Sequence, residues 1–484
     1  MHVFVTGGTG FVGSALVLRL LRDGHSVSVW TRRPEHAPAL VGGDVDIIDA
    51  RKGRDTLVAE LERADAVIHL AGESVVSRWT AERMKQLRAS RIDVTRELVE
   101  AMKACRQPPR VFLSASAVGY YGSDLGETFD EDSPPANDFL AQLCVDWEAA
   151  AQAARGTGAR VCQIRIGIVL GPGGGALASM LPVFELGLGG RLGSGRQWMS
   201  WIHLDDLAEV FAKALENPSY EGAINGVGPS PATNREFTQT LASVLNRPAI
   251  LPVPSIALRA IFGRGARALL ASQRVEAKRL AALDFEFRHP TLRGALEDAT
   301  HRGTPTVQIE PAINPPSHPY LERRGATYVL RQETLINDSL ERVFPFFSEA
   351  ANLGTLTPPD MEFRILTERP IAMASGTEID YRIRLGPLPM RWKTVIERWL
   401  PGLGFVDAQH RGPYRAWFHE HEFEAVGDQT RMVDRVWYRP PLGPIGRIVH
   451  ALFIGSMLRR IFEYRASRVR LRFGAEEKRH DLAA

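Results

Sequence analysis

The sequence predicts two architectures in succession: an α/β part on a doubly wound parallel sheet with a small helical cap, then an α+β part with an antiparallel sheet around a long C-terminal helix. From residue 1 to about 230, short β-rich runs alternate with helical patterns. This alternation is typical of a parallel sheet covered by helices on both faces. After about residue 326 strand-like runs follow one another and one long helix closes the chain, as in an antiparallel sheet.

Length and composition limit the possible classes of protein. A chain of 484 residues is too long for one ordinary core, so two or three domains are expected. The net charge of +3 is too small to indicate a nucleic-acid partner. Three widely spaced cysteines form no disulfide framework or zinc pattern. The start of the chain has no leader pattern and no segment is apolar enough to span a membrane. We therefore expect a cytoplasmic protein.

The first part is predicted to contain a sheet domain and a small helical domain. Its β-rich runs are HVFVT, VSVWT, VDIID, AVIHLA, RVFLSAS and RVCQIRIG, and its helical patterns cover Phe11–Asp23, Thr80–Cys105 and Asp138–Gly156. Three further helical patterns follow, Asn234–Leu245, Ser255–Leu270 and a short Arg274–Ala282. The predicted boundaries are residues 1–232 for the sheet domain and 233–302 for the helical domain.

A proline-rich segment separates the two parts. Prolines at 311, 315, 316 and 319 favour extended, semi-rigid chain, so residues 303–325 are predicted to be a linker. The second domain is predicted to span residues 326–475. It begins with a strand over 327–336 and a short helix over 338–350, continues through the runs EIDYRIRL, RWKTVIERWL, GFVDAQH, AWFHEHEFEAV and TRMVDRVWYRP, and ends in a helix over 443–473.

A glycine pattern after the first strand predicts a dinucleotide site. Gly7, Gly10 and Gly13 stand at GxxGxxG spacing between a strand and a helix. Such glycines allow a tight turn, close approach of the backbone to a pyrophosphate and close packing of helix on strand. The start of the helix then offers N–H groups and a positive dipole to the phosphates. We assign Phe11 and Val12, within the same turn, to the cofactor site of this Rossmann domain as well.

The end of the second strand predicts which dinucleotide binds. An NAD site carries a carboxylate there for the ribose 2′-hydroxyl, whereas an NADP site carries arginine for the 2′-phosphate. This strand ends in Arg32 and Arg33 and has no acid at its tip, so NADP(H) is the predicted cofactor. Asp49, at the end of the next strand, is expected to meet the adenine amino group. Leu70, Ala71 and Gly72 follow the fourth strand, where their backbone would line the ribose and nicotinamide.

Several of these motifs together resemble a known family. TGGTGFVG, LAGES, LSASAVGYYG and IHLDDLA are similar to the extended short-chain dehydrogenase/reductase superfamily. The resemblance is strongest to the atypical, sugar-nucleotide-epimerase-like branch of this superfamily, a group of NADP-binding oxidoreductases. GSGRQWMSWIHLDD looks like that branch specifically, and the later ASQRVEAKRLAALDFEFRHPTLRGAL looks like its small C-terminal domain. The resemblance covers residues 1–300.

The resemblance implies a catalytic Tyr and Lys at YxxxK spacing with a Ser or Thr, and this chain departs from that pattern. The Tyr moves a proton at the substrate oxygen and the Lys lowers the pKa of the Tyr. Here Phe139 and Leu143 occupy that spacing, while Ser116 stands where the third member would be. Tyr120 and Tyr121, just after Ser116, are the nearest candidates for the proton transfer, with an ordinary core role as their alternative.

Other side chains are candidates for substrate binding or catalysis, and Glu73 is a candidate for both. Glu73 and His203 are substitutes for the missing acid–base group, and Cys144 fits a buried inert thiol better than a nucleophile. Arg196, Trp198, Trp201 and His203 combine a cation, flat aromatics and an imidazole that would orient an anionic or planar substrate. The alternative is that the tryptophans fasten this loop to the sheet. The acids at 205 and 206 are expected to cap the helix at 207–216.

Residues 327–473 resemble the helix-grip fold of the START-like, polyketide-cyclase-like superfamily. The resemblance rests on DSLERVFPFFSEAANLGTLTPP, the alternating strands and the closing helix. It implies an apolar cavity that binds a small hydrophobic molecule, with cyclases and dehydratases among its members. Candidate cavity side chains are the strand aromatics Trp392, Trp399, Trp417, Phe418 and Trp437, which an ordinary core explains as well.

Two features of the second part have alternative interpretations. HEHEF offers two histidines on one face of a strand, but without a third ligand no metal site is predicted. The basic closing helix fits a solvated cationic face over an apolar stripe better than a membrane-binding helix.

Three functions follow from these observations. The first is an NADP(H)-dependent oxidoreductase or epimerase-like enzyme acting on a small molecule. The second is a catalytically silent NADPH-binding sensor or scaffold, which the missing YxxxK pair favours. The third is a carrier of a small hydrophobic ligand that responds to NADPH. The predicted partners are small molecules, with no nucleic acid and no membrane span.

Overall fold

The computed structural model describes all residues except 43, 301–306, 369, 386–387 and 477–484, and the chain divides into two compact units. The first unit comprises Met1–Pro34 and Val45–Gly303, and the second comprises Glu35–Asp44 and Thr304–Ala484. The more detailed domain boundaries given above remain predictions.

A seven-stranded, wholly parallel sheet forms the centre of the first unit, in the order β11-β7-β5-β4-β1-β2-β3. The inner strands are continuous apolar runs because helices cover both faces of the sheet. Val3, Phe4 and Val5, for example, are all fully buried. The strands are β1 (His2–Thr6), β2 (Ser26–Thr31), β3 (Asp46–Asp49), β4 (Ala66–His69), β5 (Val111–Ala117), β7 (Arg160–Ile166) and β11 (Gly222–Gly226).

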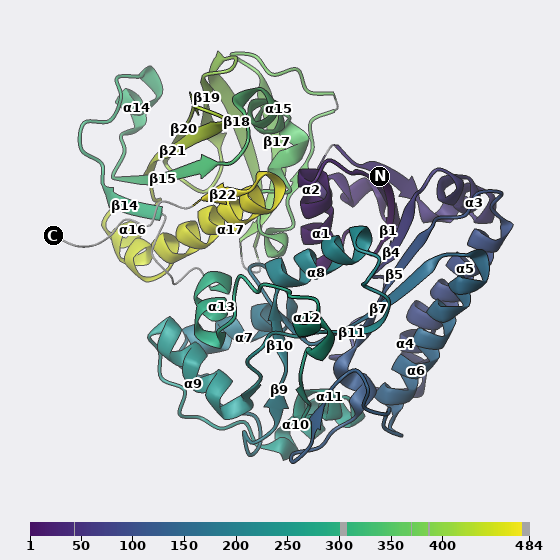
Figure 1. The fold of residues 1–484 in the computed structure, drawn as a ribbon. Helices are drawn as coiled ribbons and strands as arrows, with labels where there is room; N and C mark the ends of the chain where they lie inside the picture. The colour runs from purple at the N-terminus through teal and green to yellow at the C-terminus, as the bar shows by residue number, and fades with distance from the viewer. Residues whose placement is uncertain (43, 301–306, 369, 386–387, 477–484) are drawn as a thin grey trace. The chain divides into compact units, whose positions relative to one another are not determined.

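Helices flank this sheet on both sides, as the alternating pattern predicts (Figure 1). One layer contains α1 (Phe11–Arg22) and α8 (Leu204–Glu216), which pack on each other. The other layer contains α3 (Arg54–Glu62), α4 (Ala81–Arg88), α5 (Val94–Ala104) and α6 (Phe139–Gln152). The predicted helix over 80–105 is therefore two helices, joined by a π-helical turn at Ala89–Asp93.

Short elements complete the first unit. Two-stranded pairs join β8 (Ile168–Leu170) to β10 (Trp201–His203), β9 (Trp198–Met199) to β12 (Ala232–Thr233), and β6 (Thr128–Phe129) to β13 (Arg274–Val275). The remaining helices are α7 (Gly175–Glu185), α9 (Asn234–Leu245), α10 (Ser255–Phe262), α11 (Ala266–Leu270), α12 (Lys278–Ala282) and α13 (Leu292–Ala299). The predicted helix 255–270 is split at Gly263, where φ is +55°.

The second unit has an antiparallel sheet and a long C-terminal helix, as predicted. Its strand order is β14-β15-β21-β20-β19-β18-β17-β16, with β22 (Ala475–Glu476) paired to β15. The strands are β14 (Val307–Pro311), β15 (Tyr328–Ile336), β16 (Arg364–Ile365), β17 (Glu378–Leu385), β18 (Leu388–Leu400), β19 (Gly404–Arg411), β20 (Ala416–Val426) and β21 (Gln429–Arg439). The helices are α2 (Pro38–Val41), α14 (Pro319–Arg324), α15 (Leu340–Ser348), α16 (Gly443–Val449) and α17 (Gly455–Phe473).

Two expectations about the second unit need correction. Part of the predicted linker is regular structure, since β14 pairs with β15 and α14 follows. Proline is tolerated there because Pro311 ends an edge strand and Pro319 is the first residue of a helix. The predicted helix 443–473 is interrupted by a π-helical turn at 450–454, where the His450 ring stacks on Tyr328 at 3.8 Å and its Nε2 lies 2.7 Å from the Tyr438 hydroxyl.

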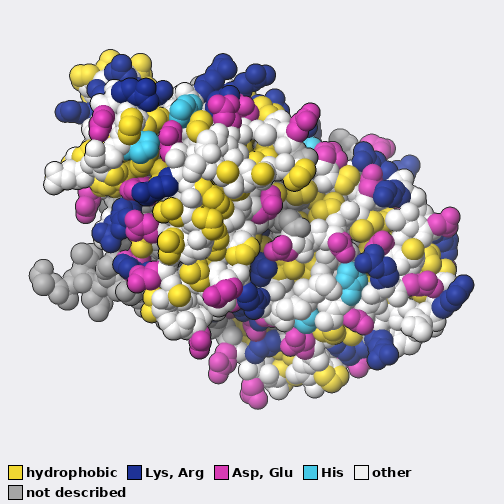
Figure 2. All heavy atoms as spheres, turned by 90° about the horizontal axis from the view of Figure 1, so that it is seen from above, with side chains coloured by type: hydrophobic (Ala, Val, Ile, Leu, Met, Phe, Trp, Pro, Cys, Tyr) yellow, Lys and Arg dark blue, Asp and Glu magenta, His cyan; other side chains and the backbone are white. Residues whose placement is uncertain are grey.

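Charges of both signs are mixed on the face shown in Figure 2, in keeping with the small net charge. Across the described part of the chain, no helix combines the length and apolar character needed to span a bilayer.

Candidate functional site

The glycine turn lies at the carboxyl edge of the parallel sheet and packs against the segment that follows β4. Gly7 has φ +72°, and a Cβ there would lie 2.6 Å from the Leu70 carbonyl carbon. A Cβ on Gly13 would lie 2.1 Å from the Gly7 oxygen. Both positions therefore require glycine. Gly10 is the N-cap of α1 and has no side chain to accept the first N–H groups of the helix, which is the arrangement that binds phosphate.

The other predicted cofactor residues follow neighbouring strands at this edge. The Leu70 N–H donates to the Thr6 carbonyl at 3.0 Å, which holds Leu70, Ala71 and Gly72 beside β1. Phe11 and Val12 are half-buried in the first turn of α1. A Cβ on Gly174 would meet the Phe11 ring, so this ring packs on the start of α7.

Arg32 and Arg33 directly follow β2 and are exposed, Arg32 to 84% of its side chain. The Arg32 guanidinium lies 3.6 Å from a carboxylate oxygen of Glu73, in the segment after β4. Asp49 is the last residue of β3, and its carboxylate is bonded within its own segment. Arg51 donates to this carboxylate through Nε and Nη2 at 2.8 Å each, and these bonds lower the pKa of Asp49 to about 2.

Two of the three candidate catalytic residues, Ser116 and Tyr121, belong to a hydrogen-bonded chain that we call the Glu148 network, comprising Ser116, Tyr121, Glu148, Arg165 and Asn225. Ser116 Oγ donates to Glu148 at 2.6 Å, and Arg165 makes two bonds of 2.9 Å to the same carboxylate. Arg165 also donates to the Tyr121 hydroxyl at 2.9 Å, and that hydroxyl donates to Asn225 Oδ1 at 2.8 Å. The network joins β5, α6, β7 and β11.

The two tyrosines differ in their surroundings. Tyr121 is 2% exposed, both sides of its hydroxyl are bonded, and burial raises its pKa to about 12. Tyr120 is half-buried, and the Arg165 guanidinium lies over its ring at 3.5 Å from the centroid. A cation in this position is attracted by the negative face of the ring.

Phe139 and Leu143, which stand at the spacing of the missing YxxxK pair, are apolar side chains in apolar surroundings. Leu143 is 2% exposed, and Phe139 packs edge-on against Trp79 at 5.3 Å. Cys144 beside them is buried, and burial raises the pKa of its thiol to about 12, as expected of an inert cysteine.

Glu148 and Arg165 were missed as site residues by the sequence analysis. A signal was present, because Arg165 interrupts the apolar strand run RVCQIRIG. A charged residue in a strand buried on both faces requires a charged partner. The sequence offered no means of identifying Glu148 as that partner.

The loop candidates lie in different environments. Trp201 is fully buried and its Nε1 donates to the Ser230 carbonyl at 2.7 Å. This environment agrees with the alternative interpretation that the tryptophan fastens its loop to the sheet. The Trp198 ring lies 4.7 Å from the Arg274 guanidinium, and Arg196 is exposed.

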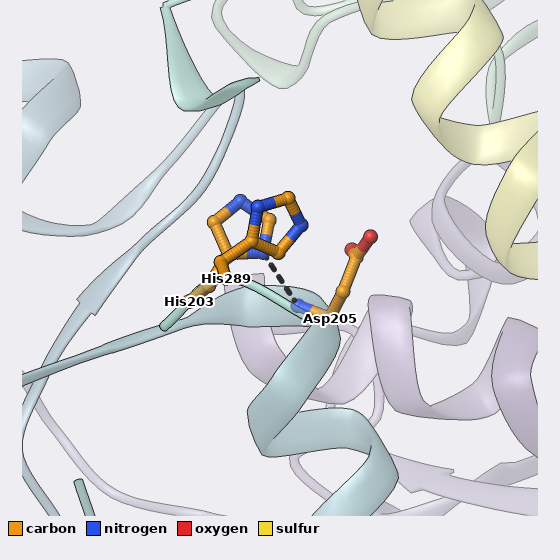
Figure 3. Close-up of side chains that lie close together, drawn as sticks. All are labelled: His203, Asp205 and His289. Atoms are coloured by element: carbon orange, nitrogen blue, oxygen red, sulfur yellow. Dashed lines mark hydrogen bonds between the residues drawn. The ribbon is translucent and has the colours of Figure 1, made fainter. Parts of the chain in front are cut away.

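His203 is fully buried at the start of α8 (Figure 3). It accepts the Asp205 backbone N–H at 3.2 Å, and its ring lies 3.8 Å from that of His289 (Figure 3). The expectation that the acids at 205 and 206 cap the helix is wrong: His203 is the N-cap, and Asp206 accepts the N–H groups of Arg288 and His289. The helix starts three residues earlier than predicted, so both acids fall inside its first turn.

The second unit encloses a cavity of about 180 Å³ with a mainly apolar lining. Of the predicted cavity aromatics, Trp392 and Trp417 line it. Phe418 belongs instead to a separate core cluster, because neighbouring residues on a strand face opposite sides of the sheet. Trp437 bonds to Glu420 at 2.8 Å, and Trp399 packs on Phe344 and Phe405.

Four charged or imidazole side chains in the lining of this cavity form, with the fully buried Asp434, a group that we call the His–Asp cluster: Asp407, His419, His421, Asp434 and Arg465. His419 and His421 point to the same face of β20, as their spacing predicts, with ring centroids 3.7 Å apart. Sheet register brings the carboxylates to them, since Asp407 pairs with His419 across β19–β20 and Asp434 pairs with His421 across β20–β21.

The members of the His–Asp cluster are close enough to interact strongly. Asp434 Oδ1 lies 3.1 Å from His419 Nε2, 2.7 Å from His421 Nδ1 and 3.3 Å from Arg465. Asp407 Oδ2 lies 3.6 Å from His419 Nδ1 and 3.0 Å from His421 Nε2. Burial lowers the pKa of His419 to about 4, whereas the bonds of His421 to both carboxylates outweigh its burial and raise its pKa. Asp407 is therefore a third potential metal ligand beside the two histidines, and the sequence pattern did not reveal it.

Comparisons with known proteins identify the first unit. The model of the NAD dependent epimerase/dehydratase family matches residues 3–225, and that of a domain of unknown function, DUF1731, matches residues 253–299. The SDR39U1 homolog of Arabidopsis thaliana, an epimerase family protein described as chloroplastic, is 44% identical over 61% of this chain and 86% of its own. The human epimerase family protein SDR39U1 is 40% identical over 62% of this chain and 99% of its own.

Solved structures agree with this result. The crystal structure of human SDR39U1 with NADPH superimposes with a TM-score of 0.56, at 40% identity over 62% of this chain and 99% of that one. A UDP-glucuronic acid 4-epimerase from Bacillus cereus, 20% identical over 61% of this chain and 97% of its own, superimposes with a TM-score of 0.51 and shows the shared fold. This chain therefore belongs to the NAD-dependent epimerase/dehydratase family, among the SDR39U1-type epimerase family proteins.

Proposed function

We propose that the first unit is an NADP(H)-dependent oxidoreductase or epimerase-like enzyme acting on a small molecule. The observation that carries the cofactor assignment is the pair Arg32–Arg33, which follows β2 next to the glycine turn. Arginine is the residue that recognises a 2′-phosphate. The 40% identical human relative was crystallised with NADPH, which supports the same assignment.

The test of the cofactor assignment is Arg32→Ala in the full chain. Loss of hydrogen bonds to a charged phosphate costs about 1.5–3 kcal/mol, roughly 10–100-fold in Kd. We expect NADPH binding, followed by nicotinamide fluorescence, to weaken by that factor while NADH binding stays the same. Arg63→Ala, which removes an exposed arginine directly after α3, is the matched control. An unchanged preference for NADPH over NADH in both Arg32→Ala and Arg33→Ala would refute the assignment.

For catalysis we propose Tyr120 as the residue that moves a proton at the substrate oxygen, with Ser116 and Tyr121 as its supporting groups. NADPH, when bound, supplies the hydride. The Arg165 guanidinium over the Tyr120 ring fixes the orientation of this ring through a cation–π contact. Tyr121 and Glu148 hold Arg165 in that position through charge-assisted hydrogen bonds. Of the two tyrosines, Tyr120 has the hydroxyl that is not tied to Arg165 and Asn225.

The second candidate function is an NADPH-binding sensor without catalysis, which the apolar Phe139 and Leu143 favour. A panel of carbonyl substrates with NADPH separates the two functions. For an enzyme we expect Tyr120→Phe to reduce kcat by roughly 100-fold or more, the usual contribution of a positioned acid–base group, with the NADPH Kd unchanged. NADPH binding with no turnover across the panel would favour the sensor, and full activity in Tyr120→Phe would exclude this tyrosine from proton transfer.

We further propose that the second unit binds a small hydrophobic molecule in its cavity. Support comes from the apolar lining and from the resemblance of its sequence to START-like domains. Dry apolar cavities of about 150 Å³ bind molecules the size of benzene. Saturation of an environment-sensitive apolar dye at one equivalent per chain, with release by competing apolar compounds, is the expected result. If the full chain binds no such dye, the proposal of a hydrophobic-ligand site is wrong.

A further inference from the structure

We infer that the His–Asp cluster of the second unit is a binding site for a divalent transition-metal ion, with Asp407, His419 and His421 as ligands. The three ligands line the cavity of the second unit, and none of them belongs to the first unit, which contains the proposed nucleotide site. The inference starts from ligand geometry. Each of the three residues offers one ligand atom, and these three atoms all lie within 4.8 Å of one another.

The separations fit one ion. An ion bonded to N and O atoms at about 2.0–2.2 Å holds neighbouring ligand atoms roughly 3.0–3.6 Å apart in octahedral or tetrahedral geometry. The Asp407 oxygen is 3.0 Å from His421 Nε2 and 3.6 Å from His419 Nδ1. Both separations between Asp407 and the histidines therefore fall within the range for ligand atoms of one ion.

Asp434 acts as the outer partner that such sites require. Histidines that bind a metal donate their second ring N–H to a carboxylate or carbonyl, which fixes the tautomer and the ring orientation. Asp434 Oδ1 lies 3.1 Å from His419 Nε2 and 2.7 Å from His421 Nδ1, the two nitrogens opposite to those facing Asp407. One buried carboxylate therefore orients both imidazoles toward the same point.

The charges of the cluster favour a divalent cation on the Asp407 side. Arg465 lies 3.3 Å from Asp434 and neutralises that carboxylate. Asp434 is fully buried, whereas Asp407 is 17% exposed and lines the cavity with both histidines. Once the ion has displaced the proton of His421, Asp407 and the two imidazoles together carry one negative charge, which attracts the divalent cation.

Two histidines and one carboxylate bind zinc, and the same set with open positions binds ferrous iron. The aromatic rings of Phe405 and Phe462 lie 4.1 and 5.5 Å from the imidazoles, so the site is largely shielded from water. Three protein ligands leave at least one coordination position free, and the cavity adjoins it. A bound ion would therefore contact an oxygen or nitrogen atom of a mostly apolar cavity ligand and act as a Lewis acid toward it.

The test uses the full chain without an affinity tag, stripped with a chelator and then titrated with Zn²⁺ and with Co²⁺ as a spectroscopic probe. We expect one equivalent to bind, with cobalt absorption bands typical of N and O ligands and without a sulfur-to-cobalt charge-transfer band. The three cysteines all belong to the first unit, so such a band would reveal binding elsewhere.

The variants Asp407→Asn and His419→Gln remove one ligand each. We expect each to weaken binding by more than the roughly 10–100-fold that loss of an outer partner costs, and Asp434→Asn to fall within that range. The control is His410→Gln, which removes an exposed histidine on β19. Circular dichroism and NADPH binding confirm that each variant folds.

Two results would overturn the inference. One is wild-type protein that binds no equivalent of either ion above the level of a histidine-poor control protein. The other is binding that survives in Asp407→Asn and His419→Gln as in the wild type. If the variants do not fold, X-ray absorption of the cobalt or zinc complex of the wild type decides, since it counts histidine ligands directly, and fewer than two would refute the site.

Discussion

Burial determines how much a pair of oppositely charged side chains contributes to the stability of this protein. Arg165 is 4% exposed and is bonded twice to Glu148, which also accepts from Ser116. Removing one partner of such a pair leaves an uncompensated buried charge. The pair of Glu100 and Lys103 on α5 is exposed to water on both sides, and pairs of that kind contribute little.

Glu148→Gln is therefore expected to destabilise the first unit strongly. Loss of a buried ion-pair partner costs about 3–5 kcal/mol. Chemical unfolding followed by intrinsic fluorescence measures this, and Glu100→Gln is the control, for which we expect no measurable change. Equal stability of the two variants would mean that the Glu148 network does not hold the sheet together.

The same substitution tests the positioning role of the network when its effect on catalysis is measured at a temperature where the variant is folded. If Arg165 positions Tyr120 for proton transfer, Glu148→Gln lowers kcat while the NADPH Kd stays the same, because the Tyr120 ring loses the oriented guanidinium that holds it. A change in stability alone, with kcat unchanged, would assign a purely structural role to Glu148.

The turn between β1 and α1 shows how one element depends on a single missing side chain. A Cβ on Gly13 would lie 2.1 Å from a backbone oxygen, and backbone cannot move away as a flexible side chain can. Gly156, at the end of the segment that follows α6, has no atom within 4 Å of the corresponding position.

Gly13→Ala is expected to push α1 away from β1 and so to impair both stability and the phosphate-binding helix start. Overpacking of this kind costs roughly 1–3 kcal/mol. NADPH titration and thermal unfolding measure the two effects, with Gly156→Ala as the neutral control. A Gly13→Ala variant with wild-type NADPH affinity would show that this helix start is not the phosphate site.

Each of the two units has its own sheet and its own core clusters. A ligand that binds only the folded form of a unit stabilises that unit, by about 2.7 kcal/mol at 100 times its Kd. We expect calorimetry of the full chain to show two unfolding transitions. NADPH should raise the midpoint temperature of one transition, and an apolar cavity ligand should raise that of the other. A single transition whose midpoint temperature rises with either ligand would mean that the two units unfold as one.

Local patterns determined most of the architecture. Alternating strands and helices, glycine spacing and the change to successive strands near residue 326 are properties of short segments, and β17 and β20 begin and end where their sequence runs do. The predicted cofactor residues come together at one edge of the sheet because the carboxyl ends of adjacent parallel strands meet there, and their role in binding stays a prediction. Proline was misjudged, since edge strands and helix starts accept it as readily as a linker does.

The partnerships between distant charged groups required the folded chain. Glu148 is 17 residues from Arg165, and the pair forms because α6 packs on the sheet that contains β7. Asp407 and Asp434 stand on the strands either side of β20, and their register places them against His419 and His421. A one-residue shift in register would turn these carboxylates to the opposite face of the sheet. Sequence periodicity reports which face a residue occupies, but register and packing decide which residue it meets there.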